Sequence, residues 1–135
     1  MSMTSLYPVL MTADVARASA FYIDALEMEV VFESDWYVSL RKGAHELALL
    51  AYDHETIPEE SRKLPQGVII NFEVDNVDAV YSRLITAGDY QEIAPLKDEA
   101  FGQRHFIISG PDAVLVDIIQ PIPPSEEYAD SYIGN

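Results

Sequence analysis

The sequence predicts an α+β protein made of two β-α-β-β-β modules, whose curved sheets surround a cleft. Two observations lead to this class. A short strand followed by an amphipathic helix occurs twice, with Asp14 and Asn76 in equivalent places 62 residues apart (76 − 14). Three further segments with strand-like composition follow each copy. Duplication of such a unit indicates two similar halves, and halves of this kind can form a cleft between them.

The first module is expected over about residues 6–53. It opens with a strand at residues 6–12 and a helix capped by Asp14, whose carboxylate can accept from backbone N–H groups that lack helical partners. The apolar stripe of this helix has helical spacing and consists of Val15, Ala18, Phe21, Tyr22, Ala25 and Leu26. The helix is expected to end near Glu27. Three strands complete the module, at residues 28–33, 36–41 and 45–52.

The second module is expected over about residues 67–121, after a polar, proline-containing linker at residues 53–66 with room for one helical turn. It opens with a strand at residues 67–74 and a helix capped by Asn76. The helix stripe consists of Val77, Val80, Tyr81, Leu84 and Ile85. Gly88 is expected to end this helix with a positive φ. The remaining strands are expected at residues 90–96, 102–108 and 114–119.

One domain is expected over residues 1–121, followed by an acidic, proline-containing tail at residues 122–135. The composition of the tail favours extended chain. Its apolar residues Tyr128, Tyr132 and Ile133 offer the alternative of docking on the body or on a partner subunit.

Composition excludes several classes of function. Eight basic and 23 acidic residues give a net charge of −15, which disfavours nucleic acid because phosphate contacts need clustered Lys and Arg. The absence of cysteine rules out disulfides and thiolate chemistry, and suits the cytoplasm. No apolar run approaches the ~18 residues of a membrane span. The first residues lack the basic and apolar regions of a signal peptide, so a cytoplasmic location is expected.

Three short motifs suggest a family. Asp14-Val15 is followed at residues 20–28 by Ala-Phe-Tyr-Ile-Asp-Ala-Leu-Glu-Met, the second helix opens on Val74-Asp75-Asn76-Val77, and Gly110-Pro111-Asp112 precedes the final strand. With the order of elements, these motifs resemble the glyoxalase/bleomycin-resistance/dioxygenase superfamily, also called vicinal oxygen chelate proteins, over roughly residues 6–121. In the family a Leu-Gly-Met-like step follows the Phe-Tyr pair. Here Glu27 replaces the glycine, which costs C-cap stability where the residue is left-handed.

The resemblance implies a pocket enclosed by the two halves, in which metal-dependent members bind an ion with four ligands from the first and last strand of each half. The matching positions here are Tyr7, Leu49, Ile69 and Asp117. Only Asp117 is a competent ligand, and a catalytic ion needs at least three good donors. We therefore expect neither a metal nor another cofactor.

The second module offers polar candidates for a small-molecule site. Strand alternation places Ile69, Asn71 and Glu73 on one face, and Leu115, Asp117 and Ile119 on one face. If these faces line the pocket, it is mostly apolar with a few polar groups. The alternative is that Asn71 and Glu73 lie on a solvent or subunit face. A lone Asp117 in an apolar strand needs a partner, for which Arg104 and His105 are the candidates.

An aromatic group, Phe32, Trp36 and Tyr37, stands beside Glu33 and Asp35 in the first module. In the bleomycin-resistance branch that the resemblance suggests, aromatic and acidic residues hold a cationic, planar drug. Stacking and cation–π attraction make this physically reasonable. Ordinary strand packing is the alternative for Trp36. The three histidines, His45, His54 and His105, show no ligand-like spacing.

These observations predict a homodimeric, metal-independent protein of the bleomycin-resistance type that binds a small molecule, such as a cationic or aromatic drug. The predicted ligand-contacting residues are Tyr7, Trp36, Leu49, Ile69, Asn71, Glu73, His105 and Asp117. No catalytic residue is assigned, since the missing ligands favour binding over catalysis. Two alternatives stay open. A glyoxalase-like lyase or ring-cleaving dioxygenase-like enzyme would need a metal site from residues such as Glu46, Glu73, His105 and Asp117. A structural or regulatory module would act through its dimer face.

Overall fold

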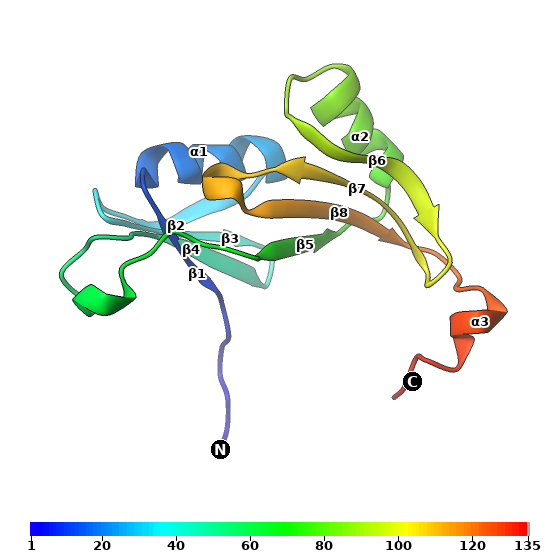
Figure 1. The fold of residues 1–135 in the computed structure, drawn as a ribbon, viewed down its shortest axis with the longest axis horizontal. Helices are drawn as coiled ribbons and strands as arrows, with labels where there is room; N and C mark the ends of the chain where they lie inside the picture. The colour runs from blue at the N-terminus through cyan, green and yellow to red at the C-terminus, as the bar shows by residue number, and fades with distance from the viewer. Residues whose placement is uncertain (135) are drawn as a thin grey trace. The chain divides into compact units, whose positions relative to one another are not determined.

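The computed structural model describes residues 1–134, which form two compact units (Figure 1). The first unit comprises Met1–Gly67 together with the short segment Gly110–Ala113. The second comprises Val68–Ser109 and the chain from Val114 onward. Each unit is built on one four-stranded mixed sheet, so the predicted α+β class with two β-α-β-β-β modules is confirmed.

The first unit has the strand order β1-β4-β3-β2, with β1 parallel to β4 and the other pairs antiparallel. Its elements are β1 (Val9–Thr12), α1 (Val15–Leu26), β2 (Glu29–Glu33), β3 (Tyr37–Lys42) and β4 (His45–Ala51). The expected helical turn in the linker is a 3₁₀ turn at Glu59–Ser61.

The second unit repeats this order as β5-β8-β7-β6, again with one parallel pair, β5 and β8. Its elements are β5 (Ile69–Glu73), α2 (Val77–Tyr81), β6 (Glu92–Glu99), β7 (Gln103–Ser109), β8 (Leu115–Pro121) and α3 (Glu126–Ala129). A π-helical segment, Ser82–Thr86, prolongs α2, and a 3₁₀ turn at Pro111–Ala113 precedes β8. The identical strand order in both units confirms the duplication that the sequence indicates.

Both helices of the repeat begin at the predicted caps. The Asp14 carboxylate accepts from the Arg17 N–H at 3.0 Å, and the Asn76 side-chain carbonyl accepts from the Ala79 N–H at 3.1 Å. Each bond satisfies one of the N–H groups that a helix start leaves without a partner. At the other end of α1, Glu27 is left-handed with φ 55°, a conformation that glycine would adopt with less strain.

The positive φ expected for Gly88 at the end of this helix is wrong. The residue has no positive φ, and the segment ends earlier, where the Ala87 N–H donates to the Ser82 carbonyl at 2.8 Å. Space is what requires glycine here. A Cβ at this position would lie 2.5 Å from the Leu84 carbonyl oxygen and 2.8 Å from that of Arg83.

One face of each sheet is buried beneath a helix. α1 packs on β3 and β4, and α2 packs on β7 and β8. The largest side chains buried in the first unit are Tyr22, Val38, Leu40 and Leu49, and in the second Val77, Leu84, Phe106, Ile108, Val114, Val116, Ile118 and Ile119. Apart from Asp117 and Ile119, which lie on the opposite face, the buried strand residues of the second sheet alternate with residues of that face, which is the more open one.

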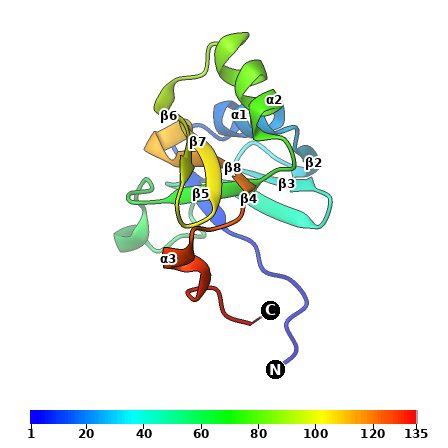
Figure 2. The same cartoon turned by 90° about the vertical axis from the view of Figure 1, so that its right-hand side faces the viewer.

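The C-terminal segment docks on the turn between β6 and β7 (Figure 2). The Ser125 N–H donates to the Ala100 carbonyl at 2.8 Å, and the Tyr132 hydroxyl donates to the Phe101 carbonyl. Docking on the body, which the sequence left open, therefore holds for Tyr128 and Tyr132, whereas Ile133 is exposed. In residues 1–134 we find no helix with the length and apolar character needed to cross a membrane.

Candidate functional site

The face of the second sheet opposite α2 carries the predicted polar residues. The parallel register pairs Ile69 with Leu115, Asn71 with Asp117 and Glu73 with Ile119. All six therefore share one face, as strand alternation predicts. The three residues of the edge strand β5 are exposed, whereas Asp117 is buried on the central strand β8.

On this face His105 is bonded between two carboxylates. Its Nδ1 lies 2.8 Å from Asp117 Oδ1, and its Nε2 lies 2.9 Å from Glu99 Oε2. Side-chain exposure rises along the line, from 10% for Asp117 through 12% for His105 to 25% for Glu99. An imidazole ring can donate from both nitrogens only when it is protonated. The geometry of the Asp117–His105–Glu99 cluster therefore favours an imidazolium held by two carboxylates, one from each neighbouring strand.

The electrostatics of the cluster agree with this assignment. Burial alone lowers the pKa of His105, but the hydrogen bonds to Glu99 and Asp117 outweigh it and raise this pKa above the ordinary 6.5. The hydrogen bond from His105 is the largest cause that lowers the pKa of Glu99 below its ordinary 4.5. Lys97, 3.5 Å from the other oxygen of Glu99, acts in the same direction.

Of the two partners expected for Asp117, the structure selects His105 and not Arg104. The Arg104 guanidinium lies on the side of the sheet that faces α2. It bonds to Asp78 of α2 at 2.8 Å and to Asp98 of β6 at 2.9 Å. Its donors are thus used in an ion-pair network on the other face. Glu99 is the member of the cluster that the sequence did not indicate.

The two family positions in the first unit differ from each other. Leu49 is 1% exposed and pairs with Leu10 and Val38, so its side chain belongs to the core beneath α1. Tyr7 is exposed, and its phenol acts on the pKa of Tyr37. Burial, this neighbouring phenol and the charge of Glu46 raise the pKa of Tyr37.

The predicted aromatic group is present in the first unit. The ring of Tyr37 lies 6.0 Å from that of Phe32 and 5.8 Å from that of Trp36. One face of Trp36 is covered, because His54 stacks on it with a centroid distance of 3.8 Å and an interplanar angle of 9°. Phe32 is 54% exposed, whereas Trp36 and Tyr37 are half-buried. Of the three rings, Phe32 therefore offers a ligand the most free surface.

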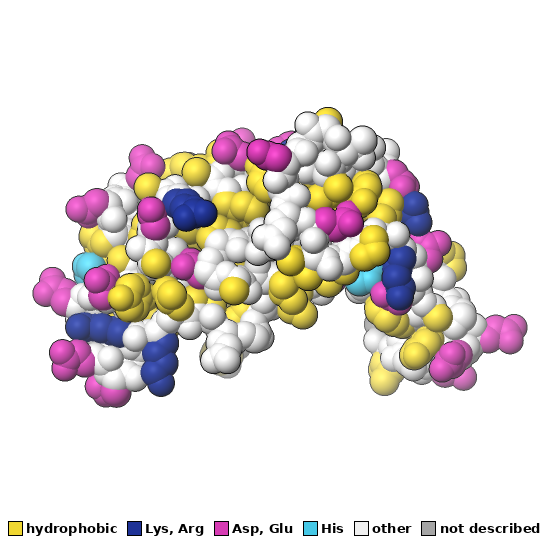
Figure 3. All heavy atoms as spheres, turned by 45° about the horizontal axis from the view of Figure 1, so that its top comes forward, with side chains coloured by type: hydrophobic (Ala, Val, Ile, Leu, Met, Phe, Trp, Pro, Cys, Tyr) yellow, Lys and Arg dark blue, Asp and Glu magenta, His cyan; other side chains and the backbone are white. Residues whose placement is uncertain are grey.

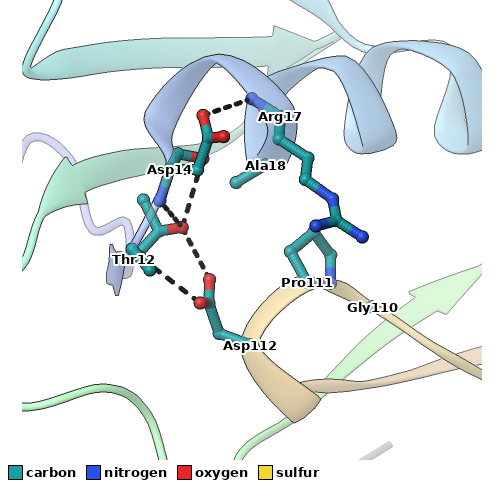
Figure 4. A pocket seen from close by; sticks show the side chains of 8 residues that line it. Thr12, Asp14, Arg17, Ala18, Gly110, Pro111 and Asp112 are labelled. Carbon is teal, nitrogen blue, oxygen red and sulfur yellow. Dashed lines mark hydrogen bonds between the residues drawn. The ribbon is translucent and has the colours of Figure 1, made fainter.

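A hollow of about 200 Å³ lies between the start of α1 and the Gly110–Ala113 segment, within the first unit (Figure 4). The Asp112 carboxylate accepts from the Thr12 hydroxyl at 2.6 Å and from the Ala13 N–H at 3.3 Å. Asp112 and Ala113 are both left-handed, with φ 58° and 62°. The bonds fix the segment to the end of β1. This role of the Gly-Pro-Asp motif was missed, since the sequence indicates only a turn there.

The residues at the family's metal positions do not fit a divalent ion. Leu49 and Ile69 have no donor atom, a tyrosine hydroxyl such as that of Tyr7 is a poor ligand, and the Asp117 carboxylate is bonded to His105. Among residues 1–134, no group of three or more His, Cys, Asp or Glu side chains is placed to hold a metal. Metal independence remains a prediction.

Comparisons with known proteins agree with this geometry. The family model of the glyoxalase/bleomycin resistance protein/dioxygenase superfamily matches residues 5–118. No curated protein matches the chain. A virulence protein from Salmonella typhimurium superposes with a TM-score of 0.73 at 24% identity, over 90% of this chain and all (100%) of that one.

Two further solved structures are similar. A glyoxalase/bleomycin resistance protein/dioxygenase family enzyme from Burkholderia phytofirmans has a TM-score of 0.73 at 20% identity, over 86% of this chain and 97% of that one. A glyoxalase/bleomycin resistance protein/dioxygenase from Nocardioides has a TM-score of 0.71 at 19% identity, over 90% and 86%. At these identities the structures show a shared fold. Together with the match over residues 5–118, they mean that the chain belongs to the glyoxalase/bleomycin resistance protein/dioxygenase superfamily.

Proposed function

We propose that this protein binds a small cationic or aromatic molecule without a metal ion, in the manner of the bleomycin-resistance branch. The observation that carries the proposal is the bond between His105 and Asp117, 2.8 Å long. Asp117 is the one carboxylate among the four family positions, and the positive ring of His105 compensates its charge as a metal ion would. A ligand is then bound by protein groups alone.

An open carboxylate oxygen in the cluster favours a cationic ligand. The imidazolium of His105 and the ammonium of Lys97 balance the charges of Glu99 and Asp117, but Asp117 Oδ2 has no hydrogen-bond partner in the described part of the chain. A protonated amine on this oxygen would form a charge-assisted hydrogen bond, roughly twice as strong as a neutral one. Acidic side chains spread over the surface in Figure 3 add long-range attraction for cations.

The surroundings of Asp117 suit an apolar body attached to that amine. Ile107 and Leu115 are half-buried on the same face, and Ile69 is exposed there. Asn71, the register partner of Asp117, supplies an exposed amide beside them. A few polar groups among apolar ones are typical of small-molecule sites.

The test compares cationic ligands with a neutral alcohol that matches the smaller of them in size and shape. Metal-free bleomycin and 2-phenylethylamine are expected to raise the melting temperature, whereas 2-phenylethanol at the same concentration is not, because only a ligand bound to the native state stabilises it. Asp117→Asn is expected to lower amine affinity at least about tenfold, the loss of one charged hydrogen bond of 1.5–3 kcal/mol. Glu60→Gln removes the same charge from an exposed 3₁₀ turn and is the control.

Two results would refute this proposal. One is an equal response to the amine and the alcohol in wild type. The other is a stoichiometric metal ion in protein purified without chelator, whose removal abolishes binding.

A second candidate function, a dimer module, is favoured by β2. This edge strand is exposed along its whole length and presents Val30, Val31 and Phe32 in succession. Contiguous apolar side chains on an open strand edge are a surface for pairing with another chain. We expect light scattering after gel filtration to give twice the chain mass of 15.1 kDa, and Val31→Lys to give the monomer. A wild-type monomer at micromolar concentration would exclude this role.

A further inference from the structure

We propose that the C-terminal segment, residues 122–132, is a positioning element that holds Glu99 against His105. The inference concerns the site described above and rests on the proposed function for its effect on ligand binding. The physical link is the turn between β6 and β7, because Glu99 is the last residue of β6 and the segment is bonded to the turn that follows it.

The turn itself is tight. Gly102 has φ 111°, and its N–H donates to the Glu99 carbonyl at 3.0 Å. The backbone of Glu99 is thus tied directly to the residue that the C-terminal segment contacts. A Cβ on Gly102 would lie 2.8 Å from the Tyr132 hydroxyl and 3.0 Å from the Ile122 carbonyl oxygen. The segment is therefore packed directly against the turn backbone.

Each of the three turn residues is held by the C-terminal segment. The Ser125 N–H donates to the Ala100 carbonyl at 2.8 Å, and the Ile122 N–H donates to the Gly102 carbonyl at 2.9 Å. Phe101 receives two contacts: its carbonyl accepts from the Tyr132 hydroxyl, and its ring meets that of Tyr128 edge-on, with centroids 6.1 Å apart. Figure 1 shows α3 and the following chain beside this end of the hairpin.

Glu99 needs such support more than the other members of the cluster. Asp117 lies on β8 and His105 on β7, and each of these strands is bonded on both sides. Glu99 ends the edge strand β6, which has a neighbour on one side only and two register irregularities along its length. Strand ends of this kind open locally at low cost in free energy. The C-terminal segment supplies the contacts that a second neighbouring strand would otherwise give.

The two ring N–H groups of His105 test this role with an internal control, because only one of them faces Glu99. Tyr132→Phe removes only the hydroxyl that bonds to Phe101. We expect the His105 Nε2–H, which faces Glu99, to exchange with water about three- to tenfold faster, as the loss of one hydrogen bond permits. The Nδ1–H, which faces Asp117, is expected to keep its rate. Tyr128→Phe is the matched control, since the Tyr128 hydroxyl has no hydrogen bond among residues 1–134.

The same variants are then titrated with 2-phenylethylamine, and Tyr132→Phe is expected to weaken binding about threefold while Tyr128→Phe does not. Unchanged exchange at Nε2–H would overturn the positioning role. Equal acceleration at both nitrogens would also overturn it, because that marks a general loss of stability. If wild type binds no amine, the proposed function fails, whereas the exchange rates still decide whether the segment positions Glu99.

Discussion

Replacement of Asp112 by alanine is expected to destabilise the protein by about 2–4 kcal/mol. The substitution removes the acceptor of two hydrogen bonds, from the Thr12 hydroxyl at 2.6 Å and from the Ala13 N–H at 3.3 Å. It also leaves alanine with φ near 58°, next to Ala113 with φ 62°. Alanine tolerates this left-handed conformation less well than aspartate, whose short polar side chain bonds locally. Urea unfolding followed by circular dichroism measures the loss.

Three companion variants separate the bonds from the backbone strain. Asp112→Gly also loses the carboxylate but accepts the positive φ, so it is expected to cost about 1 kcal/mol less than alanine. Asp112→Asn keeps one acceptor and tolerates the conformation. Thr12→Val removes the strongest donor while keeping the shape of the side chain. Equal losses for the alanine and glycine variants would show that strain at residue 112 has no energetic weight.

The parts of the fold that depend on local sequence were predicted closely. The caps Asp14 and Asn76 could be predicted because each bonds to a backbone N–H only three residues further along the chain. The apolar stripe from Val15 to Leu26 could be predicted from helical periodicity alone. The need for glycine at position 88 was predicted for the wrong reason, because steric crowding by two carbonyl oxygens cannot be inferred from a sequence.

The parts that depend on distant residues were predicted poorly. Asp112 and Thr12 are 100 residues apart, and no periodic signal joins them. Leu49 lies in a run of apolar residues, Leu47 to Leu50, in which alternation does not reveal which face is buried. Glu99 escaped notice because the second strand of the second module was expected to end at residue 96. β6 instead runs to Glu99 and holds Pro95, which an edge strand can accommodate.

The pairing of His105 with Asp117 was accessible from sequence as one of two options, because neighbouring strands bring their residues within reach. What decided between the options was the face of the sheet. Arg104 and His105 are consecutive, so their side chains point to opposite faces. Arg104 meets Asp78 beneath α2, and His105 meets Asp117 on the open face.

Replacement of His105 by leucine is expected to destabilise the protein by about 2–3 kcal/mol near pH 6, because it leaves the buried Asp117 carboxylate without its partner. The loss depends on pH. The pKa of His105 is raised, so its contribution is complete below pH 6.5 and fades as pH rises through the native pKa. The pKa of Glu99 is lowered, so its contribution is complete above pH 4.5 and fades as pH falls through the native pKa.

The difference between wild type and His105→Leu is therefore expected to be greatest between pH 4.5 and 6.5 and to shrink on both sides. His45→Leu, which changes an exposed histidine of the first unit, is the control for loss of a titrating ring. A difference that stays constant from pH 4 to 9 would mean that His105 is neutral in the native protein, and that one carboxylate faces an unprotonated nitrogen.

A double replacement then tests whether the cost comes from an unpaired charge. If the loss in His105→Leu reflects a carboxylate buried without a partner, adding Asp117→Leu removes that carboxylate and is expected to recover at least about 1 kcal/mol. Two apolar side chains of similar size fill the same space on β7 and β8 without a desolvated charge. If the losses of the two single variants simply add, the residues are not coupled. The imidazolium would then not be what compensates Asp117, and the metal-independent site would lose its physical basis.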